Sequence, residues 1–270
     1  MAIGEMIFYS KEMNRNTEFR FILPEGPNPF EKNQHYYERP AKALYLLHGH
    51  GNGNEEWLTS SSIREVSARY NIAVFMPSGE NSFYLNQKEA KKNYADYVGK
   101  ELVEYTRKTF HLSEKREDTF VGGISMGGFG ALHTGLMFPE TFSKIMALSS
   151  ALILYNIAGK KEDFNDKFGF GEWEYYTSIF GDLEHVLEND TNPEYLADQI
   201  IKSRGQVPGI YMACGTEDFL LETNRRFAEF LRQNQIPAQY YENEGDHNFR
   251  FWNPHLEKAV RWMAESGGEE

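Results

Sequence analysis

Apolar residues cluster along this chain in short runs, which is the pattern of strands buried on both faces of a sheet. Five such runs predict buried strands over residues 43–47, 72–76, 119–124, 144–149 and 210–214. Two weaker patterns predict an early strand at 17–23 and a last strand near 239–241. The spacing of these runs leaves room for a helix between most successive strands.

Helical periodicity fills most of the intervals between the predicted strands. Apolar residues recur on one face from about 94 to 110, and helical patterns also cover 126–137, 221–234 and 254–263. Strands that alternate with helices form βαβ units, which build a mostly parallel sheet covered by helices on both faces. The sequence therefore predicts the α/β class and a single domain over residues 1–270.

Two stretches depart from this alternation. Residues 26–41 are rich in proline, asparagine and charge, and they predict a surface loop. Residues 155–205 carry aromatic side chains among glycine, asparagine and charged residues. One interpretation of this insertion is a structural excursion that packs its aromatics on the body, and the other is a cap over the active site. The two are compatible, and the sequence leaves both open. The aromatics are Phe164, Phe168, Phe170, Trp173, Tyr175, Tyr176 and Phe180.

The composition supports one large core and argues against several kinds of partner. The chain has 270 residues, of which 40% are hydrophobic and 15% aromatic, enough for a single extensive core. Its formal net charge is −12, from 28 basic and 40 acidic side chains. Such a surface repels phosphate backbones and anionic lipids. We therefore expect neither nucleic acid nor membrane as a partner, and the charge favours small or neutral substrates only weakly.

The single cysteine and the first residues bear on the compartment. Cys214 has no intrachain disulfide partner, and its place in the apolar run 209–214 predicts a buried, inert thiol. The N-terminus lacks the basic segment and apolar core of a secretory signal. No apolar run approaches the ~20 residues that a membrane span requires. We expect a cytoplasmic protein.

The stretch from Thr119 to Leu132 carries the clearest chemical signal. It places Gly123-x-Ser125-x-Gly127 between an apolar strand and a small-residue helix. A serine on a sharp strand-to-helix turn needs glycines beside it, because the backbone is strained and the helix packs closely on the strand. Such a nucleophile elbow projects the serine hydroxyl above the sheet. The alternative is a glycine-rich turn with a solvated serine, and the flanking strand and helix favour the elbow.

A serine becomes a nucleophile when a neutral imidazole accepts its proton and a carboxylate orients that imidazole. In an elbow-type hydrolase the order along the chain is serine, acid and then histidine. His247 is the favoured base, because it lies in a glycine-containing loop between the last strand and the last helix. His255, at the predicted start of that helix, and His133, inside the elbow helix, are the less favoured alternatives.

Asp218 is the favoured acid. It follows the strand at 210–214, and loops at the carboxyl ends of strands gather ligand-facing groups in open α/β sheets. Glu217 and Asp246 are its rivals, each one residue from a favoured position. A solvated role for Glu217 and a loop-stabilising role for Asp246 are the simpler interpretations of these two.

The second half of an oxyanion hole is expected in the loop after an earlier strand. The strand at 43–47 runs into His48-Gly49-His50-Gly51, where glycines let the backbone approach a substrate. The backbone N–H groups of His50 and Met126 are the predicted oxyanion donors. His48 and His50 as metal ligands are a weak alternative, since no set of further ligands stands nearby. A phosphate-binding P-loop would need Gly-Lys-Ser/Thr, and none is present.

Ordered motifs from about residue 40 to 265 resemble the esterase D-like family of α/β-hydrolases. This family includes S-formylglutathione hydrolases, tributyrin esterases, carbohydrate-esterase family one acetylxylan and feruloyl esterases, and mycolyltransferases; the chain looks closest to the tributyrin-esterase branch. The motifs are Leu46-Leu47-His48-Gly49, Trp57-Leu58, Met76-Pro77-Ser78-Gly79, Gly122-Gly123-Ile124-Ser125-Met126-Gly127-Gly128, Cys214-Gly215-Thr216-Glu217-Asp218-Phe219 and Gly245-Asp246-His247.

The resemblance implies an α/β-hydrolase fold, a triad of Ser125, Asp218 and His247, and an oxyanion hole made by the His50 and Met126 amides. It implies a serine carboxylesterase for short acyl esters, among them acetyl or feruloyl esters of carbohydrates, with a small-molecule ester substrate and no cofactor or metal. An S-formylglutathione thioesterase is an alternative, against which the loop at 50–54 counts because it lacks a cysteine. A catalytically idle hydrolase fold used for binding is another. The sequence leaves open whether the protein is a homo-oligomer.

Overall fold

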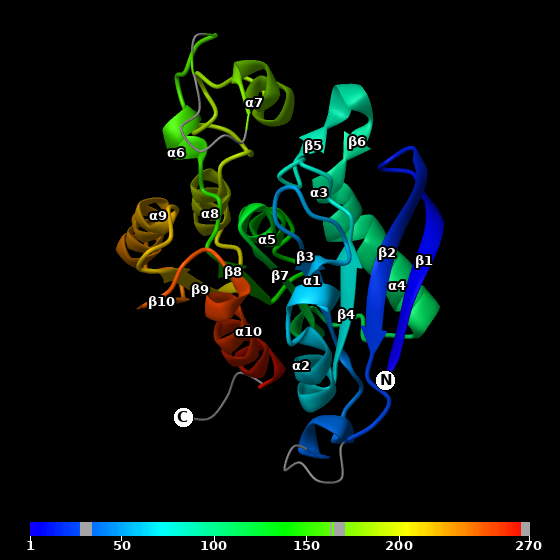
Figure 1. Ribbon diagram of the computed structural model, residues 1–270. Coiled ribbons are helices and arrows are strands. Elements are labelled where there is room, and N and C mark those ends of the chain that lie inside the picture. Colours follow the sequence, from blue (N-terminus) through cyan, green and yellow to red (C-terminus); the bar gives the residue numbers. More distant parts are fainter. Residues whose placement is uncertain (28–33, 163, 165–170, 266–270) are drawn as a thin grey trace.

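The computed structural model describes residues 1–27, 34–162, 164 and 171–265. Part of the predicted loop at 26–41, and Phe168 and Phe170 of the insertion, lie outside the described residues. Figure 1 shows a central sheet with helices on both of its faces. The helices α6 and α7 lie beyond one end of the strands, at the top of the view. Among the described residues, no helix combines the length and the apolar character needed to cross a bilayer.

Within the described residues, an eight-stranded sheet has the order β1-β2-β4-β3-β7-β8-β9-β10. β2 pairs antiparallel with β1 and β4, and the other pairings are parallel. This arrangement confirms the predicted α/β class with a mostly parallel sheet. The strands are β1 (Ala2–Ser10), β2 (Arg15–Leu23), β3 (Lys42–Leu47), β4 (Ile72–Pro77), β7 (Thr119–Ile124), β8 (Lys144–Leu148), β9 (Gly209–Gly215) and β10 (Ala238–Asn243); β5 (Asn86–Gln87) and β6 (Lys92–Asn93) form a separate ribbon.

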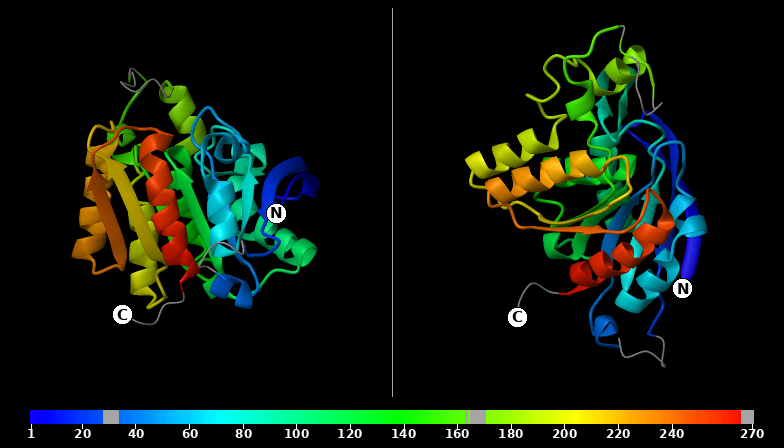
Figure 2. Two further views of the ribbon diagram at one scale, coloured as in Figure 1. Left: turned by 60° about the horizontal axis from the view of Figure 1, so that its bottom comes forward. Right: turned by 60° about the vertical axis from the view of Figure 1, so that its left-hand side comes forward.

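Helices on the two faces of the sheet enclose two hydrophobic clusters. Along β3, Tyr45 and Leu47 belong to the cluster that includes α4, α5 and α9, whereas Leu44 and Leu46 belong to the cluster of α2 and α10. All four side chains are fully buried, which explains why this strand is a continuous apolar run. Figure 2 shows α2 and α10 side by side on their face. The α-helices are α1 (Glu56–Ser60), α2 (Ile63–Tyr70), α3 (Tyr94–Asp96), α4 (Leu102–Phe110), α5 (Met126–Met137), α6 (Leu154–Ile157), α7 (Trp173–Phe180), α8 (Pro193–Lys202), α9 (Leu221–Gln233) and α10 (Phe249–Ala264).

Three parts of the fold differ from the prediction. The edge strand β1 and the helices α1 and α2 are not predicted by the apolar pattern. The predicted helix at 94–110 is helical throughout, but a π-helical turn at Tyr97–Glu101 separates α3 from α4. The last helix begins earlier than predicted, because the Asn248 side chain accepts a hydrogen bond from the Arg250 N–H at 2.9 Å and caps it.

The earlier start of α10 corrects the placement of His255. Pro254 lies inside this helix rather than at its beginning. His255 is only 3% exposed, and its Nδ1 is hydrogen-bonded to the Tyr211 hydroxyl at 2.9 Å. It is therefore a buried residue inside α10, in contact with Tyr211 and Phe251 of the second hydrophobic cluster, and does not lie at the start of the helix.

The insertion at 155–205 packs aromatic side chains against the body. Phe180 is buried, and its ring centroid lies 4.9 Å from that of Phe83 and 6.0 Å from that of Phe129. Tyr176 is also buried, and α8 packs on α5, the helix after the elbow. These contacts support the structural interpretation of the insertion.

The elbow between β7 and α5 is held by close backbone contacts. Ser125 has a positive φ of 53°, which is uncommon for a residue with a side chain. A Cβ at Gly123 would lie 2.2 Å from the Gly127 carbonyl oxygen, and a Cβ at Gly127 would lie 2.3 Å from the Leu47 carbonyl oxygen. Glycine is the residue that fits at both positions, which gives the Gly-x-Ser-x-Gly pattern its physical meaning.

We expect Gly127→Ala to lower the free energy of unfolding by about 3 kcal/mol, because its methyl group would meet backbone carbonyls that cannot move aside. Gly49→Ala is the matched control, since the nearest atom to its methyl group would lie 3.5 Å away. This control should leave the stability unchanged or raise it by up to about 1 kcal/mol. Urea unfolding measures both effects, and equal stabilities of the two variants would contradict the expectation.

Two buried histidines make the stability of the fold depend on pH. Burial lowers the pKa of His133 and of His255 to about 4, below the ~6.5 of an unfolded chain. Between these values the unfolded state binds more protons, so the free energy of unfolding should fall as the pH drops from about 6.5 towards 4. The fall should be shallower in His133→Gln than in the wild type. Urea unfolding of both proteins between about pH 6.5 and 4 measures this dependence. If the free energy of unfolding falls equally in the two proteins, His133 is not its origin.

Candidate active site

Ser125, Asp218 and His247 all follow the carboxyl ends of strands. Ser125 comes directly after β7, Asp218 after β9 and His247 after β10. These strands belong to the parallel part of the sheet, in the order β7-β8-β9-β10, so their loops meet at one edge. Ser125 is 6% exposed and Asp218 is 4% exposed. The structure thus places the three predicted residues at the same edge of the sheet.

The predicted acid and base are in direct contact. Nδ1 of His247 lies 2.8 Å from Oδ2 of Asp218, and Oδ1 of Asp218 accepts a hydrogen bond from the Leu220 N–H at 2.9 Å. The Asp218 side chain is fully buried, whereas 18% of the His247 side chain is exposed. A carboxylate on Nδ1 fixes the tautomer in which Nε2 is the proton acceptor.

The two rival acids have other partners. Glu217 accepts a hydrogen bond from the Gly245 N–H at 2.6 Å and donates its own N–H to the Gly245 carbonyl at 3.0 Å. It thereby joins the loops after β9 and β10. Asp246 accepts a hydrogen bond from the backbone N–H of His247 at 2.7 Å, a contact within its own loop. Of the three acids, Asp218 is the one that meets the imidazole.

The rival base His133 has a structural contact instead. Its Nε2 lies 2.9 Å from the Asp190 carbonyl oxygen, and the side chain is buried in the middle of α5. The hydrogen bond joins the elbow helix to the segment before α8. Cys214 is buried as predicted, and burial raises the pKa of its thiol well above the ordinary value.

Ser149 and Trp252 support Asp218, and the sequence pattern did not indicate either residue. Burial alone would raise the pKa of Asp218, but the bond and charge of His247, with the Ser149 hydroxyl and the Leu220 N–H, lower it below its ordinary value. Ser149 Oγ accepts a hydrogen bond from Nε1 of Trp252 at 2.9 Å. Its position directly after β8 is the signal that was available, because groups at this edge face the site.

His48 orients the peptide that carries the predicted His50 donor. Its Nε2 accepts a hydrogen bond from the Gly79 N–H at 2.8 Å, and its Nδ1 lies 2.8 Å from the Gly49 carbonyl oxygen. Burial lowers the pKa of His48, so the ring is neutral and Nδ1 is the donor. The Gly49 carbonyl and the His50 N–H share one planar trans peptide and point in opposite directions. Holding that carbonyl toward His48 turns the His50 N–H to the other side.

The His50 loop lies directly against the elbow. A Cβ at Gly49 would lie 3.7 Å from Cβ of Ser125, and Met126 provides the first N–H of α5. Both ring nitrogens of His48 are engaged by protein groups, which argues against a metal-binding role. Among the described residues, no group of three or more His, Cys, Asp or Glu side chains is arranged to hold a metal ion.

Tyr175 brings the insertion into contact with the His50 loop. Its hydroxyl lies 3.1 Å from Nε2 of His50 and donates to the Asn81 carbonyl at 2.8 Å. The Asn81 side chain in turn accepts a hydrogen bond from the Gly51 N–H at 2.8 Å. Part of the insertion therefore reaches the predicted oxyanion loop, which supports the cap interpretation beside the structural one.

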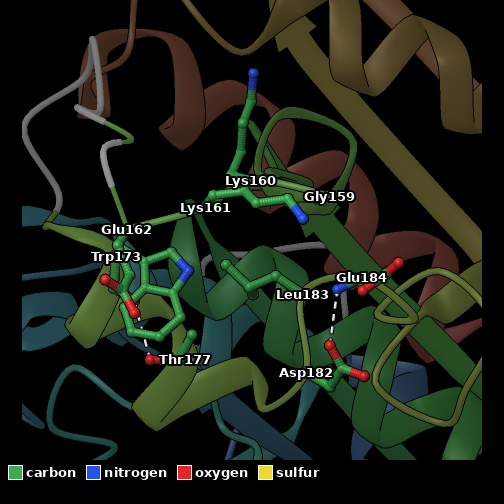
Figure 3. A pocket seen from close by; sticks show the side chains of 9 residues that line it. All are labelled: Gly159, Lys160, Lys161, Glu162, Trp173, Thr177, Asp182, Leu183 and Glu184. Atoms are coloured by element: carbon green, nitrogen blue, oxygen red, sulfur yellow. Dashed lines mark hydrogen bonds between the residues drawn. The ribbon is translucent and has the colours of Figure 1, made fainter.

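A pocket of about 590 Å³ lies within the insertion (Figure 3). Trp173 and Thr177 line it, and each is two residues from Tyr175. Residues two apart on an α-helix are separated by ~200° around the helix axis, so their side chains lie on nearly opposite sides. The pocket and the His50 loop are therefore on different sides of α7. The other lining residues are Gly159, Lys160, Lys161, Glu162, Asp182, Leu183 and Glu184.

Solved structures of similar proteins define the class. FphF, a fluorophosphonate-binding serine hydrolase of Staphylococcus aureus solved with bound substrate, is 29% identical, with a TM-score of 0.83 and 98% of both chains covered. The S-formylglutathione hydrolase FrmB of Staphylococcus aureus is 28% identical, with a TM-score of 0.80 and coverage of 98% of this chain and 99% of that one. The fold is that of α/β-hydrolases, and the chain is a serine hydrolase.

Sequence comparison gives the family. The model of the family described as "Putative esterase" matches residues 10–263, and the chain belongs to this family. An acetyl esterase of Caldicellulosiruptor saccharolyticus is 42% identical over 265 residues, which cover 98% of this chain and 99% of the relative. These matches confirm the family that the ordered motifs indicate. The chain is a carboxylic ester hydrolase.

We expect Asp218→Asn to lower kcat for nitrophenyl acetate by ~10⁴-fold, because an amide in that place favours the wrong tautomer of the base. Glu217→Gln and Asp246→Asn are matched controls that remove a neighbouring carboxylate without touching the imidazole. Both should keep kcat within about tenfold of the wild type, a limit well below the loss expected at a triad acid. A control as inactive as Asp218→Asn would move the role of the acid to that residue.

Proposed function

We propose that this enzyme is a serine carboxylesterase that hydrolyses short acyl esters, with acetyl esters of carbohydrates as its substrates, through Ser125, His247 and Asp218. The observation that carries the proposal is the 2.8 Å contact between Asp218 and His247 at the edge where Ser125 stands on its elbow. Similarity to an acetyl esterase over 98% of the chain supports the acetyl group. Feruloyl esters are the second acyl class, from the family resemblance.

The chemistry proceeds through an acyl-enzyme. Nε2 of His247 accepts the Ser125 proton as Oγ attacks the ester carbonyl carbon, and the N–H groups of His50 and Met126 bind the resulting oxyanion. The intermediate then collapses: the bond to the alcohol oxygen breaks, and His247 donates its proton to the leaving alcohol. Water attacks the acyl-enzyme in the same way, with His247 as base, and releases the acid and free Ser125.

Asp218 fits the task of stabilising the imidazolium that forms in both steps. Its lowered pKa keeps it ionised at neutral pH, and its side chain has no exposed surface to weaken the interaction with His247. The Leu220 N–H holds the other carboxylate oxygen. The charge is therefore fixed in place before the substrate arrives, as catalysis by a preorganised site requires.

A thioesterase acting on S-formylglutathione is the second candidate. The 28% identity to FrmB of Staphylococcus aureus favours it, and the same serine, histidine and acid would serve a thioester. The loop at 50–54 lacks the cysteine associated with that branch. The two candidates share their mechanism and differ in substrate, so a direct comparison of substrates separates them.

The test is the initial rate on one panel of esters for the wild type and Ser125→Ala. The panel holds nitrophenyl acetate, butyrate, octanoate and laurate, acetylated xylan, methyl ferulate and S-formylglutathione. Acetyl esters should give the highest kcat/KM, and Ser125→Ala should lose at least ~10⁴-fold in kcat while it still folds. A fluorophosphonate should label the wild type and not this variant.

Cys214→Ala is the matched control for the nucleophile, because the thiol is buried and protonated at neutral pH. It should keep its activity within a few-fold, given the inert thiol of a buried cysteine. Equal rates from the wild type and Ser125→Ala would refute the assignment of Ser125. A higher kcat/KM for S-formylglutathione than for acetyl esters would replace the proposed substrate with the thioester.

A further inference from the structure

Glu56 is a buried carboxylate beside the oxyanion loop, and the mechanism above gives it no task. It is 8% exposed and lies at the start of α1. Oε2 accepts a hydrogen bond from the Gly49 N–H at 2.7 Å, and Oε1 accepts one from the Asn52 side-chain amide at 2.6 Å. Burial raises the pKa of this carboxyl group above its ordinary value.

A carboxylate in such a place is costly for the fold. The hydrogen bonds that the Glu56 carboxylate accepts in the described part of the chain come from two neutral amide groups, those of Gly49 and Asn52. Taking a carboxylate out of water without a neutralising cation costs more than burying an apolar side chain of that size. An apolar side chain at this position would avoid that cost. The carboxylate is therefore best explained by what its two oxygens hold.

They hold the oxyanion loop at Gly49 and Asn52, and Gly49 is one of the glycines of this loop. Gly49 lacks a Cβ, so its own backbone dihedrals are only weakly restricted. Its N–H is bound by Glu56 at 2.7 Å, and its carbonyl is bound by Nδ1 of His48 at 2.8 Å. The first bond restrains the peptide before Gly49, and the second restrains the peptide after it. The second peptide carries the His50 N–H.

The position of Gly49 makes this restraint matter for chemistry. A Cβ built on Gly49 would lie 3.5 Å from Oε2 of Glu56 and 3.7 Å from Cβ of Ser125. Gly49 is therefore close to both the carboxylate and the elbow. Rotation of either peptide would move the His50 N–H relative to the atom that Ser125 attacks.

We infer that Glu56 is a positioning residue for the oxyanion hole, which holds the Gly49 N–H so that the neighbouring His50 N–H is aimed at the developing oxyanion. This inference rests on the proposed function. The hydrogen bond of Glu56 goes to the backbone of Gly49, and we assign its action to that bond. Its loss should therefore affect the transition state more than the bound substrate.

The test compares kcat and KM for nitrophenyl acetate in Glu56→Leu, Glu56→Asp and Glu56→Gln. Glu56→Leu leaves the Gly49 N–H without an acceptor and should lower kcat by about 100-fold with KM within about threefold, the pattern of a lost oxyanion donor. Glu56→Asp withdraws the carboxylate by one methylene and should lower kcat by about tenfold. Glu56→Gln keeps one oxygen for the Gly49 N–H and should restore most of the activity.

Glu55→Gln is the matched control, because it removes the same charge one residue away without a bond to Gly49. It should keep kcat and KM within about twofold, whereas removal of an oxyanion donor costs far more. A boronic acid, which forms a tetrahedral adduct on the serine, gives an independent measure. Its inhibition constant should rise in Glu56→Leu in parallel with the loss of kcat.

Wild-type kcat in Glu56→Leu, or a raised KM with unchanged kcat, overturns the inference. If Glu56→Leu does not fold, wild-type kcat in Glu56→Asp overturns it instead. The proposed function fails separately, through an active Ser125→Ala. Loss of activity in Ser125→Ala together with a fully active Glu56→Leu would leave the serine mechanism intact and remove only the role of Glu56.

Discussion

The site depends on the close approach of three backbone segments: the end of β7, the first turn of α5 and the end of β3. At Gly127 a side-chain carbon would lie 2.3 Å from the Leu47 carbonyl oxygen. Because this contact leaves room only for hydrogen, α5 lies directly on β3, and the loop after β3 is brought beside Ser125. A larger residue at this contact would separate the proposed nucleophile from the amide that we propose as an oxyanion donor.

From that contact, backbone hydrogen bonds continue past the strand ends and carry the site across the sheet. The Ser125 N–H donates to Leu148 of β8, the Ser149 N–H donates to Ala213 of β9, and the Thr216 N–H donates to Asn243 of β10. Each bond ties the first residues of one loop to the next strand. The positive φ of Ser125 and Ser149, 53° and 45°, persists because these bonds over-determine the backbone there. The loop that carries Asp218 is thus held by hydrogen bonds that run from one strand to the next.

The sequence predicts those parts whose signal is local. Continuous apolar runs give the buried strands, and the glycines around Ser125 give the elbow, because each pattern is visible within a few neighbouring residues even where the contacts behind it are long-range. The pattern does not predict β1, because this strand lies at an edge and, within the described residues, pairs with β2 alone, so it needs no continuous apolar run. The sequence pattern predicts that the last helix starts at Pro254, but Asn248 caps it and α10 begins at Phe249, five residues earlier. Ser149 and Glu56 are missed because the fold sets their partners: Ser149 meets Trp252, far along the chain, and Glu56 meets Gly49 through the conformation of the loop between β3 and α1.

Two buried carboxylates show how the same burial leads to opposite results. Asp218 meets His247 at 2.8 Å, and the bonds and charge of its partners lower its pKa in spite of burial. Glu56 meets amide groups instead of an imidazole, so burial prevails and its pKa is raised. In the proposed mechanism, the first environment keeps a charge ready to stabilise the imidazolium. In the second environment, Glu56 accepts a hydrogen bond from the backbone. Whether Glu56 is protonated or ionised, one of its oxygens can accept from the Gly49 N–H. Glu56 can therefore hold the backbone whether or not it is charged, whereas the proposed role of Asp218 requires a charge.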